Sequence, residues 1–581
     1  MGLISELRRR NVLRMAVLYA VAAWFIMQVA EVMMSLVGLP VWAGRATFAV
    51  LAVGFPIALI FSWFYEITPE GISLEKDVDP AESITHVTGR RLDFIVISLL
   101  CAAVILFAYD KWWMSGPPEQ SIAVLPFVNM SDDASNEYFS DGISEELLNL
   151  LARIPELRVV SRTSAFFYKD KKINLVDVAR DLNVAHILGG SVRKAGNQVR
   201  ITVQLIEARS DTHLWSETYD RTLDDIFSVQ DEIAAVVVER LKVTLLGVSP
   251  KVEETDPEAY ALYLQAHHLA NIATAENLQR ATILYKEALA IDPKYVPALL
   301  GLGKVYGRLA GVRVLTTEEA RALALEAIER AINIDPNSAE AQSHLGWEFF
   351  KHSSDLEAAA HHFDRALTFE PTNTNIIGNV SIFLTALGRL KEAINLAEYQ
   401  VSRDPANARA YNNLGIRYRF AGQFEQAKKA FATALTFNPL HFGVDYELGA
   451  TLLLEGDYDA AADAFERESH VVFKQIGMAM TYHAQGESAL SHELLKELIS
   501  SYGEGITYYI AQIMAFRGEI DGAFEWLEKA NLANDYELSN VINEPLLSNL
   551  YADPRWLPFL EKIGKSPEQL AAIEFNVTLP E

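Results

Sequence analysis

The sequence predicts a multidomain fold: transmembrane α-helices, then an α/β (α+β) domain with a mixed sheet, then an all-α superhelix of repeats. Three observations support this order. The first 117 residues hold three long apolar segments, alternating apolar patterns and glycine turns follow, and prolines then recur at a fixed interval. The chain of 581 residues also exceeds the usual size of one domain.

Residues 1–117 are predicted to form a membrane region with three transmembrane helices, at about 12–36, 46–67 and 92–113. Each segment offers roughly 20 residues, which is enough to cross a hydrocarbon core of about 30 Å. A cleaved signal peptide is disfavoured for the first segment because its apolar region is too long and a second segment follows almost at once.

The flanking cations predict the orientation of these helices. Arg8, Arg9 and Arg10 precede the first segment, and Arg90 and Arg91 lie between the second and the third. Loops rich in lysine and arginine stay on the cytoplasmic side. We therefore expect a cytoplasmic N-terminus and C-terminal domains on the opposite side of the membrane.

Charge and composition disfavour several classes of function. A net charge of −26 would repel a nucleic acid over most of the surface. The single cysteine, Cys101, allows neither a disulfide framework nor a cysteine-based zinc site. The pairs His267-His268 and His361-His362 lack the HExxH spacing, and adjacent residues of a helix point about 100° apart, so no metal site and no cofactor are expected.

The stretch NMSDDASNEYFSDGISEELLNLLAR, residues 129–153, carries six carboxylates and raises the question of an active site. Ser140 or Asp141 suits a helix N-cap, and Glu145 and Glu146 would then lie in the first turn, where the helix dipole favours negative charge. We interpret the stretch as a loop followed by a helix start. An enzyme that uses this cluster remains the least favoured hypothesis, because no nucleophile motif, phosphate loop or catalytic domain accompanies it.

Residues 119–248 are predicted to form the α/β domain, with element order β-α-β-α-β-β-β-α and the last three strands antiparallel. Apolar and polar residues alternate along 198–207, and Gly196-Asn197 suits a tight hairpin turn. The basic and aromatic run 162–172, RTSAFFYKDKK, is interpreted as a solvated surface loop with buried phenylalanine.

Four segments of this domain, IAVLPFVNMS, YFSDGISEELLNLLARIPELRVVSRTS, DVARDLNVAHILGGSVRKAGNQVRITVQLIEA and HLWSETYDRTLDDIFSVQDEIA, together resemble the FlgO/TolB-amino-terminal-like domain. That domain forms the extracytoplasmic part of CadC-type regulators and of some class III adenylate cyclases. Their output domain is cytoplasmic and N-terminal, whereas here few residues precede the first predicted helix. We therefore expect neither a cyclase nor a DNA-binding regulator from this chain by itself.

The membrane region resembles a module that precedes proteobacterial tetratricopeptide proteins, through LISELRRRNVLRMAVLYAVAAW and GFPIALIFSWFYEITPEGI. This resemblance implies a bacterial membrane-anchored protein. Combined with the cation distribution, it gives the expected location: a multi-pass protein of the bacterial inner membrane with periplasmic C-terminal domains.

Residues 255–581 are predicted to form a tetratricopeptide repeat array of about eight repeats with a C-terminal cap. Pro371, Pro405 and Pro439 close successive copies and are 34 residues apart, which is the tetratricopeptide period. In the copy that fits best, Gly415 lets two helices approach each other while Phe431 fills the space between them.

Such an array has a groove that takes peptide segments of partner proteins. Asparagine amides can hold a peptide backbone and arginine can bind a carboxylate, although these side chains could also serve only to solvate the groove. The expected function is a non-catalytic, inner-membrane-anchored periplasmic scaffold; the alternative is a transmembrane sensor whose α/β domain binds an envelope ligand and acts on a separate cytoplasmic protein. Neither a monomer nor a homo-oligomer is favoured. The candidate partner-binding residues are Asn375, Asn379, Arg409, Asn412 and Arg419.

Overall fold

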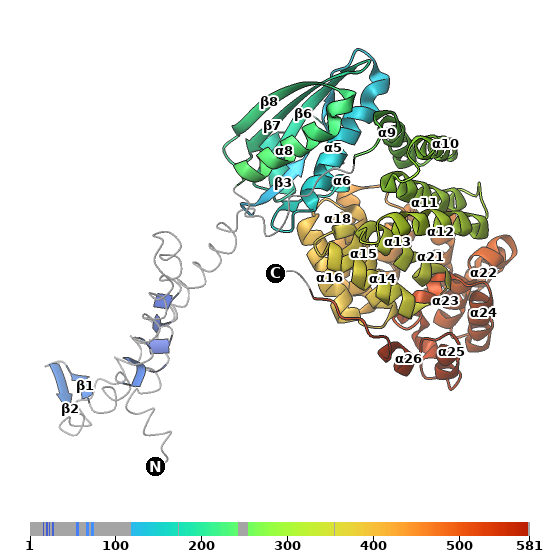
Figure 1. Ribbon diagram of the computed structural model, residues 1–581. Helices are drawn as coiled ribbons and strands as arrows, with labels where there is room; N and C mark the ends of the chain where they lie inside the picture. Colours follow the sequence, from blue (N-terminus) through green and yellow to red (C-terminus); the bar gives the residue numbers. More distant parts are fainter. Residues whose placement is uncertain are drawn as a thin grey trace. The chain divides into compact units, whose positions relative to one another are not determined.

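The computed structural model divides the chain into two compact units, Met1–Gly116 and Pro117–Glu581 (Figure 1). In the second unit the structure describes residues 118–171, 174–241, 254–353 and 355–578. In the first unit it describes a few isolated residues and two strands, β1 (Tyr65–Thr68) and β2 (Gly71–Leu74).

Strands β1 and β2 form an antiparallel hairpin in which Ile67 pairs with Ile72. The prediction that the helix 46–67 extends through residues 65–67 is therefore wrong. The alternation of Tyr65 and Ile67 with polar residues favours a strand, and Pro69, which follows directly in the sequence, cannot continue a helix. Most of the three predicted transmembrane segments lies outside the described residues. Within the described residues, none of the helices combines the length and apolar character that crossing a bilayer requires.

The α/β domain contains one mixed sheet with strand order β5-β3-β6-β7-β8, and the short strand β4 also pairs with β6. Strand β3 is parallel to β5 and β6, whereas β6, β7 and β8 are antiparallel to one another, as predicted. Gly196 adopts a φ of 60° in the predicted turn between β6 and β7. The strands are β3 (Ser121–Val124), β4 (Val128–Asn129), β5 (Arg158–Val159), β6 (His186–Ala195), β7 (Gln198–Glu207) and β8 (Thr212–Thr222).

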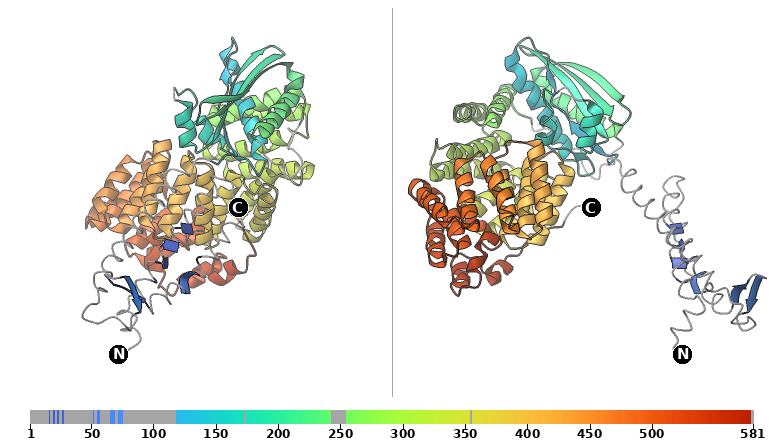
Figure 2. Two further views of the ribbon diagram at one scale, coloured as in Figure 1. Left: turned by 90° about the vertical axis from the view of Figure 1, so that its left-hand side faces the viewer. Right: turned by 180° about the vertical axis from the view of Figure 1, so that it is seen from behind.

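Helices α5 (Glu137–Ala152) and α8 (Ile226–Arg240) cover one face of this sheet, and α7 (Leu175–Asp181) covers part of the other (Figures 1 and 2). The predicted alternation along β7 is confirmed, because its apolar side chains are buried on the α5–α8 side. A short helix, α6 (Arg162–Phe166), follows β5.

The rest of the described chain forms helix pairs that stack side by side. Gly415 faces Phe431 so closely that an added Cβ would come within 2.4 Å of its ring, as the repeat pattern predicts. The eight pairs are α9 (Pro257–Ile272) with α10 (Ala275–Ile291), α11 (Val296–Gly311) with α12 (Thr317–Ile334), α13 (Ala339–Glu348) with α14 (Leu356–Phe369), α15 (Thr374–Ala386) with α16 (Leu390–Arg403), α17 (Ala408–Phe420) with α18 (Phe424–Phe437), α19 (Val444–Glu455) with α20 (Tyr458–Arg467), α21 (Val471–Ala484) with α22 (Ser488–Tyr502), and α23 (Thr507–Phe516) with α24 (Ile520–Leu532).

The first helices of neighbouring pairs contact each other, for example α15 with α17, α17 with α19 and α19 with α21. They therefore line the inner surface of the array, which we call the concave face. After α24 the chain forms a C-terminal cap composed of η7 (Tyr536–Asn540), η8 (Pro545–Leu550), α25 (Trp556–Lys562) and α26 (Pro567–Ala571).

The α/β domain and the first helix pairs share a single hydrophobic core. Helix α9 packs on α5, and Tyr260 of α9 contacts Phe227 of α8 with ring centroids 4.8 Å apart. The two domains predicted from the sequence are thus joined by apolar packing. Figure 2 shows from two further sides how the sheet and its helices lie beside the first helix pairs.

Candidate functional site

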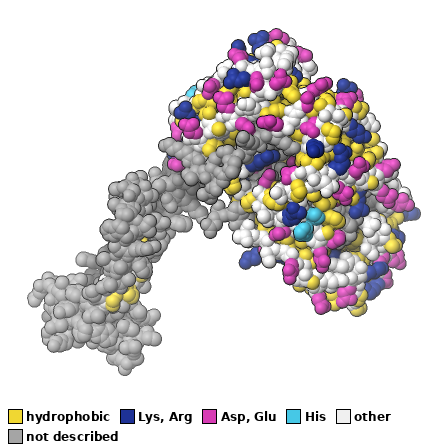
Figure 3. All heavy atoms as spheres, viewed as in Figure 1, with side chains coloured by type: hydrophobic (Ala, Val, Ile, Leu, Met, Phe, Trp, Pro, Cys, Tyr) yellow, Lys and Arg dark blue, Asp and Glu magenta, His cyan; other side chains and the backbone are white. Residues whose placement is uncertain are grey.

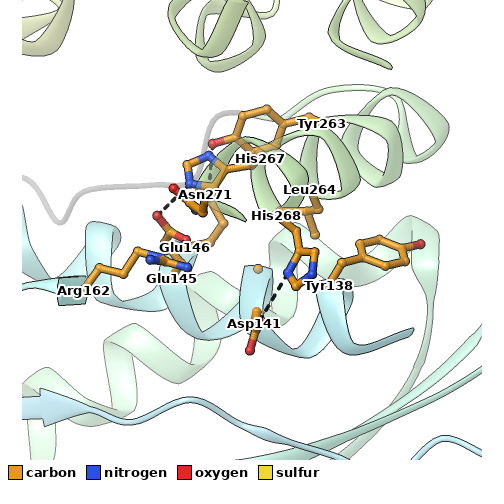
Figure 4. A pocket seen from close by; sticks show the side chains of 11 residues that line it. Tyr138, Asp141, Glu145, Glu146, Arg162, Tyr263, Leu264, His267, His268 and Asn271 are labelled. Carbon is orange, nitrogen blue, oxygen red and sulfur yellow. Dashed lines mark hydrogen bonds and ion pairs between the residues drawn. The ribbon is translucent and has the colours of Figure 1, made fainter. Parts of the chain in front are cut away.

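The acidic stretch belongs to a pocket between the α/β domain and the first helix pair, which we call the interdomain pocket (Figure 4). Helix α5 begins at Glu137, so the interpretation of Ser140 or Asp141 as its N-cap is wrong. Asp133 instead caps the short 3-10 helix Ala134–Asn136 that leads into α5. Asp141 and Glu145 then lie one turn apart, with Glu146 next to Glu145, on the helix side that faces α9.

Asp141 has two polar partners, His268 and Lys169. His268 Nδ1 lies 3.4 Å from Asp141 Oδ2, and Lys169 Nζ lies 2.6 and 2.7 Å from the two carboxylate oxygens. Burial would raise the pKa of Asp141, but the hydrogen bonds from His268 and Lys169 lower it below its usual value. Asp141 is therefore a fixed negative charge between the two domains.

The adjacent carboxylates Glu145 and Glu146 differ in protonation. Glu145 lies 3.0 Å from His267 Nε2 and 2.6 Å from Arg162 Nε. Against the effect of burial, these two groups lower the pKa of Glu145 to about 2. Burial and the charge of Glu145 raise the pKa of Glu146 to about 7, although the Tyr263 hydroxyl donates to it at 3.3 Å.

This pocket brings together the acidic stretch and the pair His267-His268, which lie more than 100 residues apart in the sequence. In the described part of the chain, however, no three His, Cys, Asp or Glu side chains converge on a point that could hold a metal ion. Lys169 and Arg162 already neutralise the two ionised carboxylates, and a metal ion would be repelled by both. The groups of the pocket join two domains and hold a titratable carboxyl group at their interface.

A second interface joins the α/β domain to the fourth and fifth helix pairs. Ser164 Oγ donates to Asp404 Oδ1 and accepts from the Ala406 backbone N–H at 3.1 Å, in a fully buried setting. Arg158 Nη2 donates to the Ser402 carbonyl at 2.9 Å. The ring of Phe167 packs edge-on against Phe437 at 5.6 Å. The interpretation of residues 162–172 as a solvated surface loop is therefore wrong, since much of this run forms a domain interface.

The C-terminal cap covers part of the concave face. Tyr536 packs against Trp347 of α13, and Asn543 Nδ2 donates to the Thr385 carbonyl of α15 at 2.6 Å. The cap also brings Glu544 to Arg419 of α17, with a 2.6 Å contact between Arg419 Nη1 and Glu544 Oε1. The prediction that Arg419 binds a partner is corrected by this contact, because its side chain is 3% exposed and is already paired.

The other predicted groove residues differ in their accessibility. Asn379 is half-buried and donates to Ser343 Oγ at 3.2 Å. Asn375 and Arg409 are exposed, and Arg409 has no hydrogen bond or ion pair to any described residue. Asn412 is half-buried, and its Oδ1 atom has no hydrogen-bond partner within the described residues. Their role in binding a partner remains a prediction.

Three arginines of different elements lie close enough for their positive charges to interact. They are Arg162 of α6, Arg308 of α11 and Arg409 of α17. Arg308 donates from Nη1 to the Ala270 carbonyl at 2.6 Å. Burial, with the positive charges of Arg162 and Arg409, lowers the pKa of Arg308. We call these residues the groove arginines.

Two family models match parts of the chain. Residues 118–236 match the second domain of HilA/YgeH-like transcriptional regulators, and residues 412–469 match a tetratricopeptide repeat model. The chain therefore contains a segment similar to tetratricopeptide repeats and a domain similar to one found in transcriptional regulators. The FlgO/TolB-like resemblance and the membrane anchor remain predictions.

Among curated proteins, the chain is 37% identical over 237 residues to "Putative adenylate cyclase 3" of Rhizobium meliloti. It is 26% identical over 154 residues to human protein O-mannosyl-transferase TMTC3. The first alignment covers 39% of this chain and 39% of the relative. The second covers 26% of this chain and 16% of the relative. The chain therefore spans well under two thirds of the length of each relative. Among solved structures, Pseudomonas aeruginosa pilF matches 37% of this chain and 96% of its own, at 19% identity and a TM-score of 0.29.

Sequence reasoning missed both domain interfaces. The carboxylates of α5, at positions 141 and 145, share the four-residue spacing of one helix side, which was a usable signal once the helix start was placed correctly. The pairing of Ser164 with Asp404 had no signal, because 240 residues separate the two.

Proposed function

We propose that this protein is a non-catalytic scaffold, anchored in a membrane, whose helical repeats bind acidic segments of partner proteins. The eight helix pairs and the tetratricopeptide match support the repeat architecture, which elsewhere presents extended binding surfaces. No catalytic role is assigned to any residue.

The observation that carries the proposal is the gathering of the groove arginines. The chain has a net charge of −26, and Figure 3 shows acidic side chains spread over much of the visible surface. Against this background, the positive charges of Arg162 and Arg409 add to burial in lowering the pKa of Arg308, and Arg162 is already paired with Glu145 at 2.6 Å. The exposed Arg409, which has no hydrogen bond or ion pair to any described residue, is the group that could bind a carboxylate of an acidic segment through two parallel hydrogen bonds.

The structure also suggests which part of the concave face takes the partner. The C-terminal cap contacts the C-terminal ends of α15 and α17, where Arg419 forms an ion pair with Glu544. Asn375 and Arg409 lie near the starts of α15 and α17 and are exposed. The proposed partner segment therefore runs along the starts of these first helices, beside the α/β domain.

Photo-crosslinking in cells tests this proposal on the full chain. A photoreactive amino acid at position 375 should capture a protein partner, and the substitution Arg409→Glu should abolish that capture. The same photoreactive residue at position 280, on the exposed side of α10, is the control and should not capture the same partner. Capture at position 375 that is unaffected by Arg409→Glu would contradict the proposal.

The proposed location is a bacterial inner membrane, with several passes, a cytoplasmic N-terminus and periplasmic repeats. The three apolar segments and the distribution of flanking cations support it. Reporter fusions at Lys76 and at Glu581 test it. A cytoplasmic signal at Lys76 and a periplasmic signal at Glu581 are expected, and the same signal at both positions would overturn the topology.

A second candidate function, signalling, is favoured by the interdomain pocket. Its charged groups join α5 to α9, so a ligand or a protonation change there would alter how the α/β domain is held against the repeats. In this alternative the chain transmits the change to a separate cytoplasmic output protein. Cross-links from the 67–91 loop to a cytoplasmic protein would support the signalling function. Loss of partner binding only in variants of the concave face would favour the scaffold function.

A further inference from the structure

A hollow lies between the third helix pair and the C-terminal cap. It contains about 440 Å³ of empty space, part of which is open to solvent. Phe350 and Lys351 come from the π-helical turn Phe349–Ser353 that follows α13, and the loop after α24 and the cap supply the rest. The remaining lining residues are Asn531, Asn534, Asp535, Tyr536, Leu538, Ser539, Ile563 and Lys565.

Lys565 is the unusual residue of this hollow. It is only 5% exposed, and its ammonium group has no hydrogen bond or ion pair to any residue in the described part of the chain. Its backbone N–H donates to the Leu560 carbonyl after Gly564, which has a φ of 71°, so the end of α25 fixes its position. Burial lowers the pKa of Lys565 to about 8, and the side chain therefore remains mostly protonated at neutral pH.

A buried ammonium without a counter-charge costs several kcal/mol unless something compensates it. The one carboxylate in the lining cannot do so easily, because Asp535 is already engaged. Its Oδ2 atom accepts from Thr507 Oγ1 at 2.8 Å and from the Tyr508 N–H at 3.2 Å, and its Oδ1 atom accepts from the Glu537 N–H at 3.1 Å. The hollow thus contains a free cation and lacks a free anion.

The other polar groups of the hollow can donate hydrogen bonds. The Ser539 hydroxyl is buried beside the Tyr536 phenol and makes no well-formed hydrogen bond within the described residues. Asn531 and Asn534 contribute amides, and the exposed Lys351 adds a second positive charge at the edge. Phe350, Leu538 and Ile563 supply apolar surface.

We propose that this hollow binds a small organic carboxylate, with its carboxylate group on Lys565 and Ser539 and its apolar part against Phe350, Leu538 and Ile563. A single buried ammonium matches a single negative charge. A phosphate dianion would place a second charge near Asp535 and beside apolar side chains, which is unfavourable. The bound ligand joins the third helix pair to the cap and so stabilises the covering of the concave face by the cap. This site does not depend on the proposed scaffold function.

Butyrate is a suitable probe, because it has one carboxylate and a short apolar chain. Saturation-transfer NMR on the detergent-solubilised full-length protein should show contact with butyrate, and acetate should compete whereas phosphate should not. The absence of any saturable signal with the wild-type protein would overturn the proposal without the need for a variant.

Two substitutions locate the site. Lys565→Met should weaken butyrate binding at least tenfold and leave the thermal stability of the ligand-free protein equal or higher, since it removes an unpaired buried charge. Lys496→Met, on the exposed side of α22, is the matched control and should bind like the wild type. Undiminished binding by the Lys565 variant would overturn the proposal, as would an equal loss in both variants.

The pH profile separates binding from a structural role. Butyrate affinity should fall as the pH rises above about 8, where the Lys565 ammonium loses its proton. The other titratable groups of the lining are Lys351, Asp535 and Tyr536, and burial raises the pKa of Tyr536 above this range. Affinity independent of pH between 6 and 10 would exclude an ion pair with Lys565.

Discussion

Arg419 and Glu544, 125 residues apart in the sequence, form an ion pair in which both side chains are less than 5% exposed. Arg419 comes from the fifth helix pair and Glu544 from the C-terminal cap. The contact means that the repeats bind a segment of their own chain on one part of the concave face. A partner protein would therefore bind to the uncovered part of this face.

Loss of this ion pair should destabilise the protein strongly. Glu544→Gln leaves Arg419 buried with a weaker partner, Glu447, at 3.1 Å, and should cost about 3–5 kcal/mol of unfolding free energy. Chemical denaturation measures the loss. Glu528→Gln removes an exposed ion pair with Lys562 and should cost less than about 1 kcal/mol. Equal effects of the two substitutions would show that the cap does not depend on the buried pair.

Contacts between residues that are near in the sequence, or that recur with the repeat period, could be predicted, whereas contacts between distant residues could not. The hairpin at Gly196 and the close packing of Gly415 on Phe431 are local or recur with the repeat period, so the sequence pattern predicts them. The sequence predicts that Arg419 faces the groove, but nothing near it in the sequence indicates that Glu544 would pair with it.

The interdomain pocket was missed for a different reason. The sequence pattern predicts a helix start at Ser140 or Asp141, whereas α5 begins at Glu137, so Asp141 and Glu145 are neither capping nor first-turn residues. Their partners His267 and His268 lie more than 100 residues away, and two adjacent histidines carry no pattern that points to a carboxylate. Contacts of this kind depend on how whole domains pack.

The packing of Gly415 can be tested directly. Gly415→Ala introduces a Cβ atom 2.4 Å from the Phe431 ring and should cost about 1–3 kcal/mol. Gly307→Ala, at an exposed position in α11 with open space around it, should be neutral or stabilising by up to about 1 kcal/mol. Thermal unfolding compares the two. A Gly415 variant as stable as the wild type would contradict the close approach of α17 and α18.

The second interface depends on the buried bond between Ser164 and Asp404. Asp404→Ala leaves the Ser164 hydroxyl and the Asn407 amide without an acceptor and should cost about 2 kcal/mol or more. Hydrogen exchange should increase in α6 and around residues 402–406. Asp463→Ala, at an exposed position in α20, should change neither quantity. Unchanged exchange in α6 would show that the α/β domain is held elsewhere.

The interdomain pocket predicts a dependence of stability on pH. The pKa of Glu146 is about 7 in the folded protein and near its ordinary value of 4.5 in the unfolded chain. The folded state therefore binds the proton more tightly, and stability is lost as the pH rises from about 4.5 to 7. Glu146→Gln should remove this loss and raise the melting temperature at pH 8, whereas Glu276→Gln on the exposed side of α10 should not.

Glu145 produces the opposite slope in a lower range. Its pKa of about 2 lies below its ordinary value of 4.5, so its contribution to stability is present above about 4.5 and is lost as the pH falls toward 2. Glu145→Gln should reduce stability at pH 7 and make stability depend less on pH in the acid range. The same dependence of stability on pH between about 2 and 4.5 in the variant and in the wild type would contradict the ion pairs of Glu145 with His267 and Arg162.

Binding of an acidic decapeptide of glutamates to the full-length protein, followed by fluorescence anisotropy, tests the central claim most directly. The account predicts saturable binding that weakens with added salt, falls at least tenfold with Arg409→Glu, and is unchanged within twofold by Arg280→Glu, the same charge reversal on the exposed side of α10. Equal affinity of the Arg409 variant and the wild type would contradict the claim that the open concave face binds acidic partner segments.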